Sequence, residues 1–162
     1  MSVDFSQIKT GGTFLTTVVG TNKVFCKESF SEEERMIYEA MCDFATNELL
    51  PLSQSDLNKK DEKLIRKLVE QMGELGFLGI DVPEKYGGSE MTKTGMCILA
   101  EGISMSGSAS FCTVWNVQTS IGSLGIIWYG NDEQKQKWLP GICSGKKIAA
   151  FALTEPEAGS DA

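Results

Sequence analysis

Apolar residues recur at the spacing of an α-helix between Asp61 and Gly76. They form one stripe with a period of about 3.6 residues, made of Leu64, Ile65, Leu68, Val69, Met72 and Leu75. Asp61 is a residue type that caps helix N-termini, and glycine commonly follows a helix C-terminus. The pattern therefore predicts a helix between these two residues, with its apolar stripe packed in the core.

A second helix is predicted upstream, beginning at Ser31. Ser31 and Glu34 form the S-x-x-E pattern of a capping box, in which the two side chains satisfy free backbone N–H groups. Apolar residues follow at near-helical spacing, and the helix is expected to stop before Pro51. The turn-rich stretch from Gly79 to Gly88 separates the helix that begins at Asp61 from the next element.

Two more helices are predicted further along the chain. One starts near Thr92 and runs to about Met105, although Gly95 and Gly102 weaken its helical pattern. The other is capped by Asn131 and ends at Gly145.

The segment from Ser108 to Tyr129 is small or apolar almost throughout and carries few charges. Such a segment is expected to be buried on most sides. It is too long for one strand, and Gly122 and Gly125 interrupt it. We therefore expect two short buried helices with a break near residues 118–120.

The two ends of the chain differ from this helical part. Residues 1–30 have mixed polarity and no helical period, which predicts an extended arm. Ile148 to Leu153 form a short, continuous apolar run, which predicts a buried strand. Nothing else in the sequence completes a sheet around that strand.

Composition narrows the function. The chain of 162 residues contains no histidine, which excludes Ser-His and Cys-His catalysis and zinc held by imidazole. Its net charge of −7 argues against nucleic acid as a partner. Five widely spaced cysteines without a C-x-x-C pair suggest neither a disulfide framework nor a thiolate metal site, so we expect reduced thiols and a cytoplasmic location. No segment has the pattern of a signal peptide or of a membrane span.

Several segments, taken in order, are similar to those of one enzyme family. The closing segment FALTEPEAGSDA, from Phe151 to Ala162, closely resembles the T-E-P-x-x-G-S-D signature of the acyl-CoA dehydrogenases. GELGFLGIDVPEKYGG (Gly73 to Gly88) and YGNDEQKQKWLPGICSG (Tyr129 to Gly145) resemble segments of the same family. KTGGTFL, from Lys9 to Leu15, resembles the arm that precedes the very-long-chain branch.

The resemblance implies an all-α fold, an up-and-down bundle of about five or six helices with an extended N-terminal arm and one C-terminal β-strand. It divides the chain into the arm (residues 1–30), the helical domain (31–148) and the first strand and signature loop of a middle β-domain (149–162). In the family a later glutamate removes the α-proton of a fatty acyl-CoA and a hydride passes from the β-carbon to FAD. No residue of this chain can be assigned the glutamate's role.

The family's cofactor contacts can be transferred to only a few residues. Phe151, Leu153 and Thr154 match positions beside the flavin ring, and Gly159 and Ser160 match the turn near the FAD pyrophosphate and CoA. These positions imply FAD in the full-length family, whereas we expect this chain alone to bind none, because one wall cannot enclose a cofactor. Glu155 and Pro156 are interpreted as ordering the loop.

The family's acyl slot would lie along the two helices predicted between Ser108 and Tyr129. Its candidate lining residues are Thr113, Val114, Val117, Ile121 and Leu124. Small or aliphatic side chains there would leave room for a fatty chain, unless Trp115 and Trp128 fill the space. Ordinary packing between helices explains the same residues about equally well.

Three functions remain open at this stage. The first is a truncated family module that binds a fatty acyl chain or acyl-CoA without turnover. The second is the N-terminal part of a full FAD-dependent enzyme that oxidises fatty acyl-CoA at the α,β-bond, and the third is a protein assembly module. We also expect a homo-oligomer, because an unpaired apolar strand promotes association.

Overall fold

The computed structural model describes residues 27–52 and 61–160. Within these ranges it contains six α-helices and no β-strand. The helices are α2 (Glu32–Phe44), α4 (Glu62–Glu74), α5 (Lys93–Ser104), α6 (Ala109–Thr119), α7 (Leu124–Tyr129) and α8 (Asp132–Cys143). Short helical turns add η2 (Lys27–Ser29), the π-helical η3 (Ala45–Leu49) and η4 (Glu84–Tyr86).

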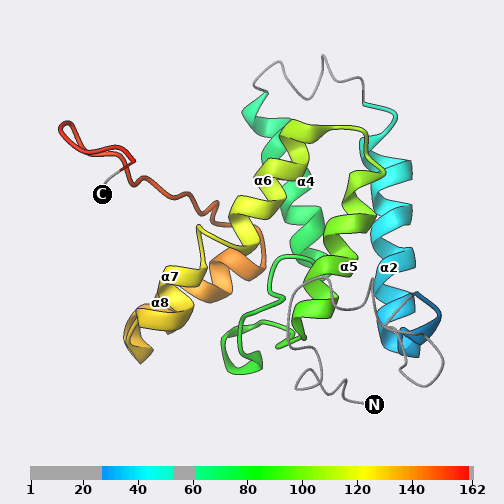
Figure 1. Ribbon diagram of the computed structural model, residues 1–162, viewed down its shortest axis with the longest axis horizontal. Helices are drawn as coiled ribbons and strands as arrows, with labels where there is room; N and C mark the ends of the chain where they lie inside the picture. The colour runs from blue at the N-terminus through cyan, green and yellow to red at the C-terminus, as the bar shows by residue number, and fades with distance from the viewer. Residues whose placement is uncertain (1–26, 53–60, 161–162) are drawn as a thin grey trace, which may run out of the picture.

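Helices α2, α4, α5 and α6 run alternately up and down beside one another, and α7 and α8 lie together at one end (Figure 1). The expected up-and-down helical fold is therefore confirmed. The predicted N-terminal arm falls on residues 1–30, of which residues 1–26 lie outside the described part of the chain.

The predicted helix starts are confirmed by their side-chain caps. The Ser31 hydroxyl accepts a hydrogen bond from the backbone of Glu34, whose carboxylate in turn accepts the Ser31 N–H, so the capping box is complete. Asp61, Thr92 and Asn131 also cap their helices as expected. Local sequence signals thus fix where these helices begin.

Two hydrophobic clusters hold the helices together. The larger one is formed mainly by α2, α4, α5 and α6, and the predicted stripe of α4 contributes Leu68, Val69 and Met72 to it. The smaller one joins α8 to the loop before α5, through Val82 and Tyr86 on the loop and Leu139, Ile142 and Cys143 on α8. The Tyr86 hydroxyl also donates to Asp132 Oδ1 at 2.6 Å. This bond, followed by the nearby Lys85 ammonium, lowers the pKa of the Asp132 carboxyl.

Helix α8 approaches α4 very closely where both end. A Cβ on Gly73 would lie 2.3 Å from the carbonyl carbon of Ser144. Gly145 follows with φ of +73°, a backbone conformation that glycine adopts without strain. The two glycines allow the chain to turn sharply after α8, in close contact with α4, and to continue toward residues 151–162, the signature segment.

Two expectations about burial are wrong. The run from Ser108 to Tyr129 is not buried on most sides, because α7 has no fully buried residue and Trp128 and Tyr129 are exposed. The run from Ile148 to Leu153 forms no strand within the described residues, and Phe151 and Leu153 are 57% and 55% exposed. A strand needs a partner for its backbone groups, and the described part of the chain offers none.

The cysteines of the described residues differ in their exposure to solvent. Cys143 is buried, Cys42 and Cys112 are half-buried, and Cys97 is exposed. Cys26 lies outside the described residues. Burial in the smaller cluster raises the pKa of the Cys143 thiol from 9.0 to about 11.

This raised pKa predicts a pH-dependent contribution of Cys143 to stability. Between pH 9 and about 11 the unfolded thiol loses its proton while the folded thiol keeps it. Raising the pH through this window therefore favours unfolding. We expect the free energy of unfolding, measured in urea, to fall more steeply with pH for the wild type than for Cys143→Ala. Parallel curves for the two proteins would contradict the burial of this thiol.

Candidate functional site

The candidate acyl-chain residues follow α6 into α7. Thr113 is exposed, and its hydroxyl donates to the Ala109 carbonyl at 2.9 Å. Val117 lies one turn further on and is half-buried, whereas Val114 packs against the larger core cluster. Ile121 is 53% exposed in the break between the helices, and Leu124 begins α7 half-buried. The structure thus places Thr113 and Val117 on one helix face and turns Val114 toward the core.

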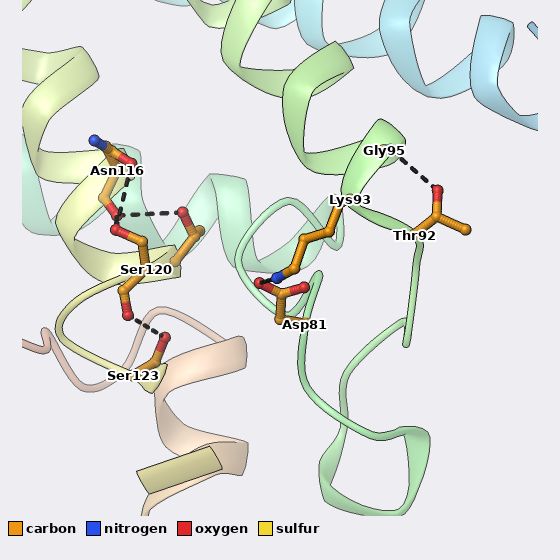
Figure 2. A network of polar contacts seen from close by, with 8 residues as sticks. Asp81, Thr92, Lys93, Gly95, Asn116, Ser120 and Ser123 are labelled. Carbon is orange, nitrogen blue, oxygen red and sulfur yellow. Dashed lines mark hydrogen bonds and ion pairs between the residues drawn. The ribbon is translucent and has the colours of Figure 1, made fainter. Parts of the chain in front are cut away.

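The break between α6 and α7 comes within a few residues of the predicted position and is held by polar side chains. The Ser120 hydroxyl donates to the Asn116 carbonyl at 2.5 Å, and the Ser123 hydroxyl donates to the Ser120 carbonyl at 3.3 Å (Figure 2). Hydroxyl groups that bond to the preceding turn compete with helical continuation. This network ends α6 and sets the direction of α7. Figure 2 also shows the Lys93–Asp81 ion pair at 2.6 Å, which ties the loop before α5 to the start of that helix.

Trp115 and Trp128, either of which could fill the slot in place of a fatty chain, differ in their burial. Trp115 is buried in the larger cluster, where its indole Nε1 donates to the Phe77 carbonyl at 3.0 Å. Trp128 lies on the exposed surface of α7. Trp115 therefore belongs to the core and does not fill a surface slot beside Val117.

Gln118 is the residue of this region that the sequence did not single out. Its buried side chain donates from Nε2 to the carbonyls of Ile142 at 3.0 Å and Lys147 at 2.8 Å. Its Oε1 accepts the Ala149 N–H at 2.7 Å. One amide thus ties α6, the end of α8 and the segment that leads to the signature residues. The available signal was an amide side chain, two residues after Asn116, within a largely apolar run.

The candidate cofactor residues lie on a segment that leaves the helices (Figure 1). Phe151, Leu153, Thr154, Gly159 and Ser160 are all exposed. The backbones of Glu155 and Ala158 bond to each other, from N to O at 2.8 Å and 3.3 Å, which closes a turn around Pro156. Backbone groups hold this turn, and the Glu155 carboxylate accepts no hydrogen bond from the described residues, in contrast to the expectation that the carboxylate orders the loop.

These residues fit one side of a flavin site. An aromatic ring, an aliphatic side chain and the Thr154 hydroxyl are exposed together, and a Cβ on Gly159 would meet no atom within 4 Å. The hydroxyl of Thr154 makes no hydrogen bond with any residue of the described ranges and is therefore available to a ligand. No other described element faces this segment, so the described residues supply one wall of such a site and no enclosure.

Other kinds of site find no support among the described residues. They contain no cluster of acidic, cysteine or histidine side chains that could hold a metal ion. None of their helices combines the length and apolar character needed to cross a bilayer.

The sequence model of the acyl-CoA dehydrogenase N-terminal domain matches residues 31–146. A probable acyl-CoA dehydrogenase of Bacillus subtilis is 40% identical over all of this chain and 27% of its own length. The human mitochondrial short-chain specific acyl-CoA dehydrogenase is 39% identical over 81% of this chain and 31% of its own length.

Solved structures agree with these relatives. The crystal structure of an acyl-CoA dehydrogenase from Bacillus anthracis, complexed with FAD, superposes with a TM-score of 0.80 and 42% identity. The match covers 93% of this chain and 25% of that one. The chain thus spans about a quarter to a third of the length of such relatives. It belongs to the acyl-CoA dehydrogenase family and has the fold of that family's N-terminal domain.

Proposed function

We propose that this chain forms the acyl-chain-binding helical part of an FAD-dependent acyl-CoA dehydrogenase, and that the isolated 162-residue chain binds a fatty acyl chain without dehydrogenating it. The chain would consist of an arm (1–30), a helical domain (31–148) and the start of a middle domain (149–162). FAD would accept the hydride in the complete enzyme.

The observation that carries the proposal is the half-covered apolar surface of α6 and α7. Val117 and Leu124 are half-buried and Ile121 is exposed, so a methylene chain laid over them would complete their burial. Each buried CH₂ contributes about 0.8 kcal/mol, which is enough for an apolar surface to hold a fatty chain without contacts to CoA.

The signature segment supports the second half of the proposal. Phe151, Leu153 and Thr154 are exposed and would form one side of a flavin site. Turnover requires the flavin to be enclosed and an acid–base group to be held against the substrate. The described residues supply the first wall alone.

The acyl-binding surface is tested by Val117→Trp. An indole at this position displaces several methylenes of the ligand, so the fraction of protein that retains dodecanoate is expected to fall at least about tenfold. Native mass spectrometry of the purified chain, incubated with dodecanoate, gives the bound fraction. Met36→Trp, which enlarges an exposed apolar residue on α2, is the matched control and should retain the ligand.

Two results would overturn parts of this proposal. Unchanged retention by Val117→Trp would place the fatty chain elsewhere on the molecule. Reduction of an electron-acceptor dye by the isolated chain, supplied with FAD and dodecanoyl-CoA, would show that it dehydrogenates unaided.

The exposed apolar residues also favour a second candidate, an assembly module. Trp128, Tyr129, Phe151 and Leu153 are all exposed, and such residues commonly pack against protein. Homo-oligomer formation is proposed on the same ground. Absence of lipid retention by the wild type, together with association of the chain, would favour this candidate over acyl binding.

A further inference from the structure

A hollow of about 510 Å³ lies between α4, α7, α8 and the segment that leaves α8. Its apolar lining includes Ile126, Trp138 and Ile148, and its cationic lining is Arg66, Lys146 and Lys147. None of the candidate acyl or cofactor residues borders it. The hollow is therefore a separate feature from the surface of α6 and α7 described above.

The three cations of this hollow form no ion pair with any acidic side chain in the part of the chain that the structure describes. Among the described residues, Arg66, Lys146 and Lys147 form no ion pair, although Glu62 and Glu70 stand one turn before and after Arg66 on α4. Three cations without acidic partners around one hollow contrast with the net charge of −7 of the whole chain. Their common surface attracts anions.

Lys147 is held in place against the apolar floor. Its stem crosses α8 at Gly141, where a Cβ would lie 2.8 Å from Lys147 Cδ. Its ammonium lies 4.2 Å from the centre of the Trp138 ring, within the range of a cation–π contact. Its backbone N–H donates to the Gly141 carbonyl, and Gln118 bonds to its carbonyl. A positive charge is thus fixed beside an exposed aromatic surface.

We propose that this hollow binds an amphipathic organic anion, with the apolar body on Ile126, Trp138 and Ile148 and the anionic end between Arg66, Lys146 and Lys147. The volume is within the range of small-molecule sites, about 300–1,000 Å³. An apolar floor removes water from the ligand body, and unpaired cations form charge-assisted hydrogen bonds with a carboxylate, sulfonate or phosphate. The site goes beyond the proposed acyl surface and does not depend on it.

The test uses naphthalene-1-acetate as the anionic probe and naphthalene-1-acetamide as its neutral counterpart. Both carry the same apolar ring, so only the charge differs between them. Binding is followed by the ¹H–¹⁵N resonance of the Trp138 indole, assigned with Trp138→Phe. We expect the acetate to shift this resonance and to bind at least about tenfold more tightly than the acetamide.

The double substitution Lys146→Gln/Lys147→Gln is expected to weaken acetate binding at least about tenfold. Lys63→Gln/Lys67→Gln removes the same charge from exposed positions of α4 that do not line the hollow and should change acetate binding by less than about twofold. Equal binding of acid and amide, an unshifted Trp138 resonance, or equal weakening by both double variants would overturn the proposal.

Val117→Trp should leave the binding of naphthalene-1-acetate unchanged. The proposal for this hollow and the proposal for the acyl surface can therefore be disproved separately.

Discussion

Replacing Gly73 with alanine is expected to lower the free energy of unfolding by about 3 kcal/mol. The added Cβ would lie 2.3 Å from the Ser144 carbonyl carbon, 2.4 Å from its oxygen and 2.8 Å from the Gly145 nitrogen. All three atoms belong to the backbone, so no side-chain rotation relieves the overlap. Helices α4 and α8 would have to separate, which uncovers apolar surface of both clusters. Urea denaturation followed by circular dichroism measures the change.

The control for this substitution is Gly125→Ala on α7. A Cβ at Gly125 meets no atom within 4 Å. Alanine is favoured over glycine inside a helix by about 1 kcal/mol, so this variant is expected to be as stable as the wild type or more stable. The same chemical change thus has opposite signs at the two positions. A Gly73→Ala variant as stable as Gly125→Ala would show that α4 and α8 do not meet this closely.

The helical part of this fold could be predicted from sequence because its signals are local. The capping side chains of Ser31, Asp61, Thr92 and Asn131 act within four residues. Each of the four helices α2, α4, α5 and α8 begins at the residue after its cap. The contact of Gly73 with Ser144 could not be predicted in this way. It depends on how two helices far apart in the sequence meet, which no local pattern specifies.

Burial was predicted less well because it depends on what covers a segment. The apolar character of Ser108 to Tyr129 correctly indicates two helices, yet it does not indicate that α7 is only partly covered within the described residues. The same holds for Phe151 and Leu153, whose apolar run predicted a buried strand. A strand and a buried face each need a second segment that covers or pairs with the first, and the described residues supply only one segment of each pair.

The site was predicted only through its resemblance to a family. That resemblance implies that Thr154 and Gly159 contact the cofactor and that Val117 lines an acyl slot, but it implies no role for Arg66, Lys146 or Gln118. Lys146 and Lys147, which follow α8, belong to no sequence motif that links them to Arg66. These lysines and Arg66 line one hollow only because the fold brings residues 146–150, which follow α8, next to α4.

Gln118→Leu is expected to lower the free energy of unfolding by about 2–4 kcal/mol. The leucine fills a similar volume but makes no hydrogen bond, so the Lys147 carbonyl and the Ala149 N–H lose the partners that the described residues provide. The Ile142 carbonyl still accepts the Gly145 N–H at 3.1 Å. Both lost bonds are part-buried, so water offsets some of the loss, and each of the two backbone groups left without its partner costs about 1–2 kcal/mol. Gln136→Leu, at an exposed position of α8, should change stability by less than about 0.5 kcal/mol.

Gln118→Glu separates the loss of the donor from the loss of the acceptor. An ionised carboxylate still accepts the Ala149 N–H but donates nothing to the carbonyls of Ile142 and Lys147, which it would repel. We therefore expect this variant to be strongly destabilised at neutral pH and to recover part of its stability, relative to wild type, as acid protonates the carboxylate. Hydrogen exchange at the Ala149 amide should accelerate in Gln118→Leu and less so in Gln118→Glu. If the exchange of the Ala149 amide accelerates equally in the two variants, the hydrogen bond from Ala149 N–H to Gln118 Oε1 does not hold the segment after α8 in place.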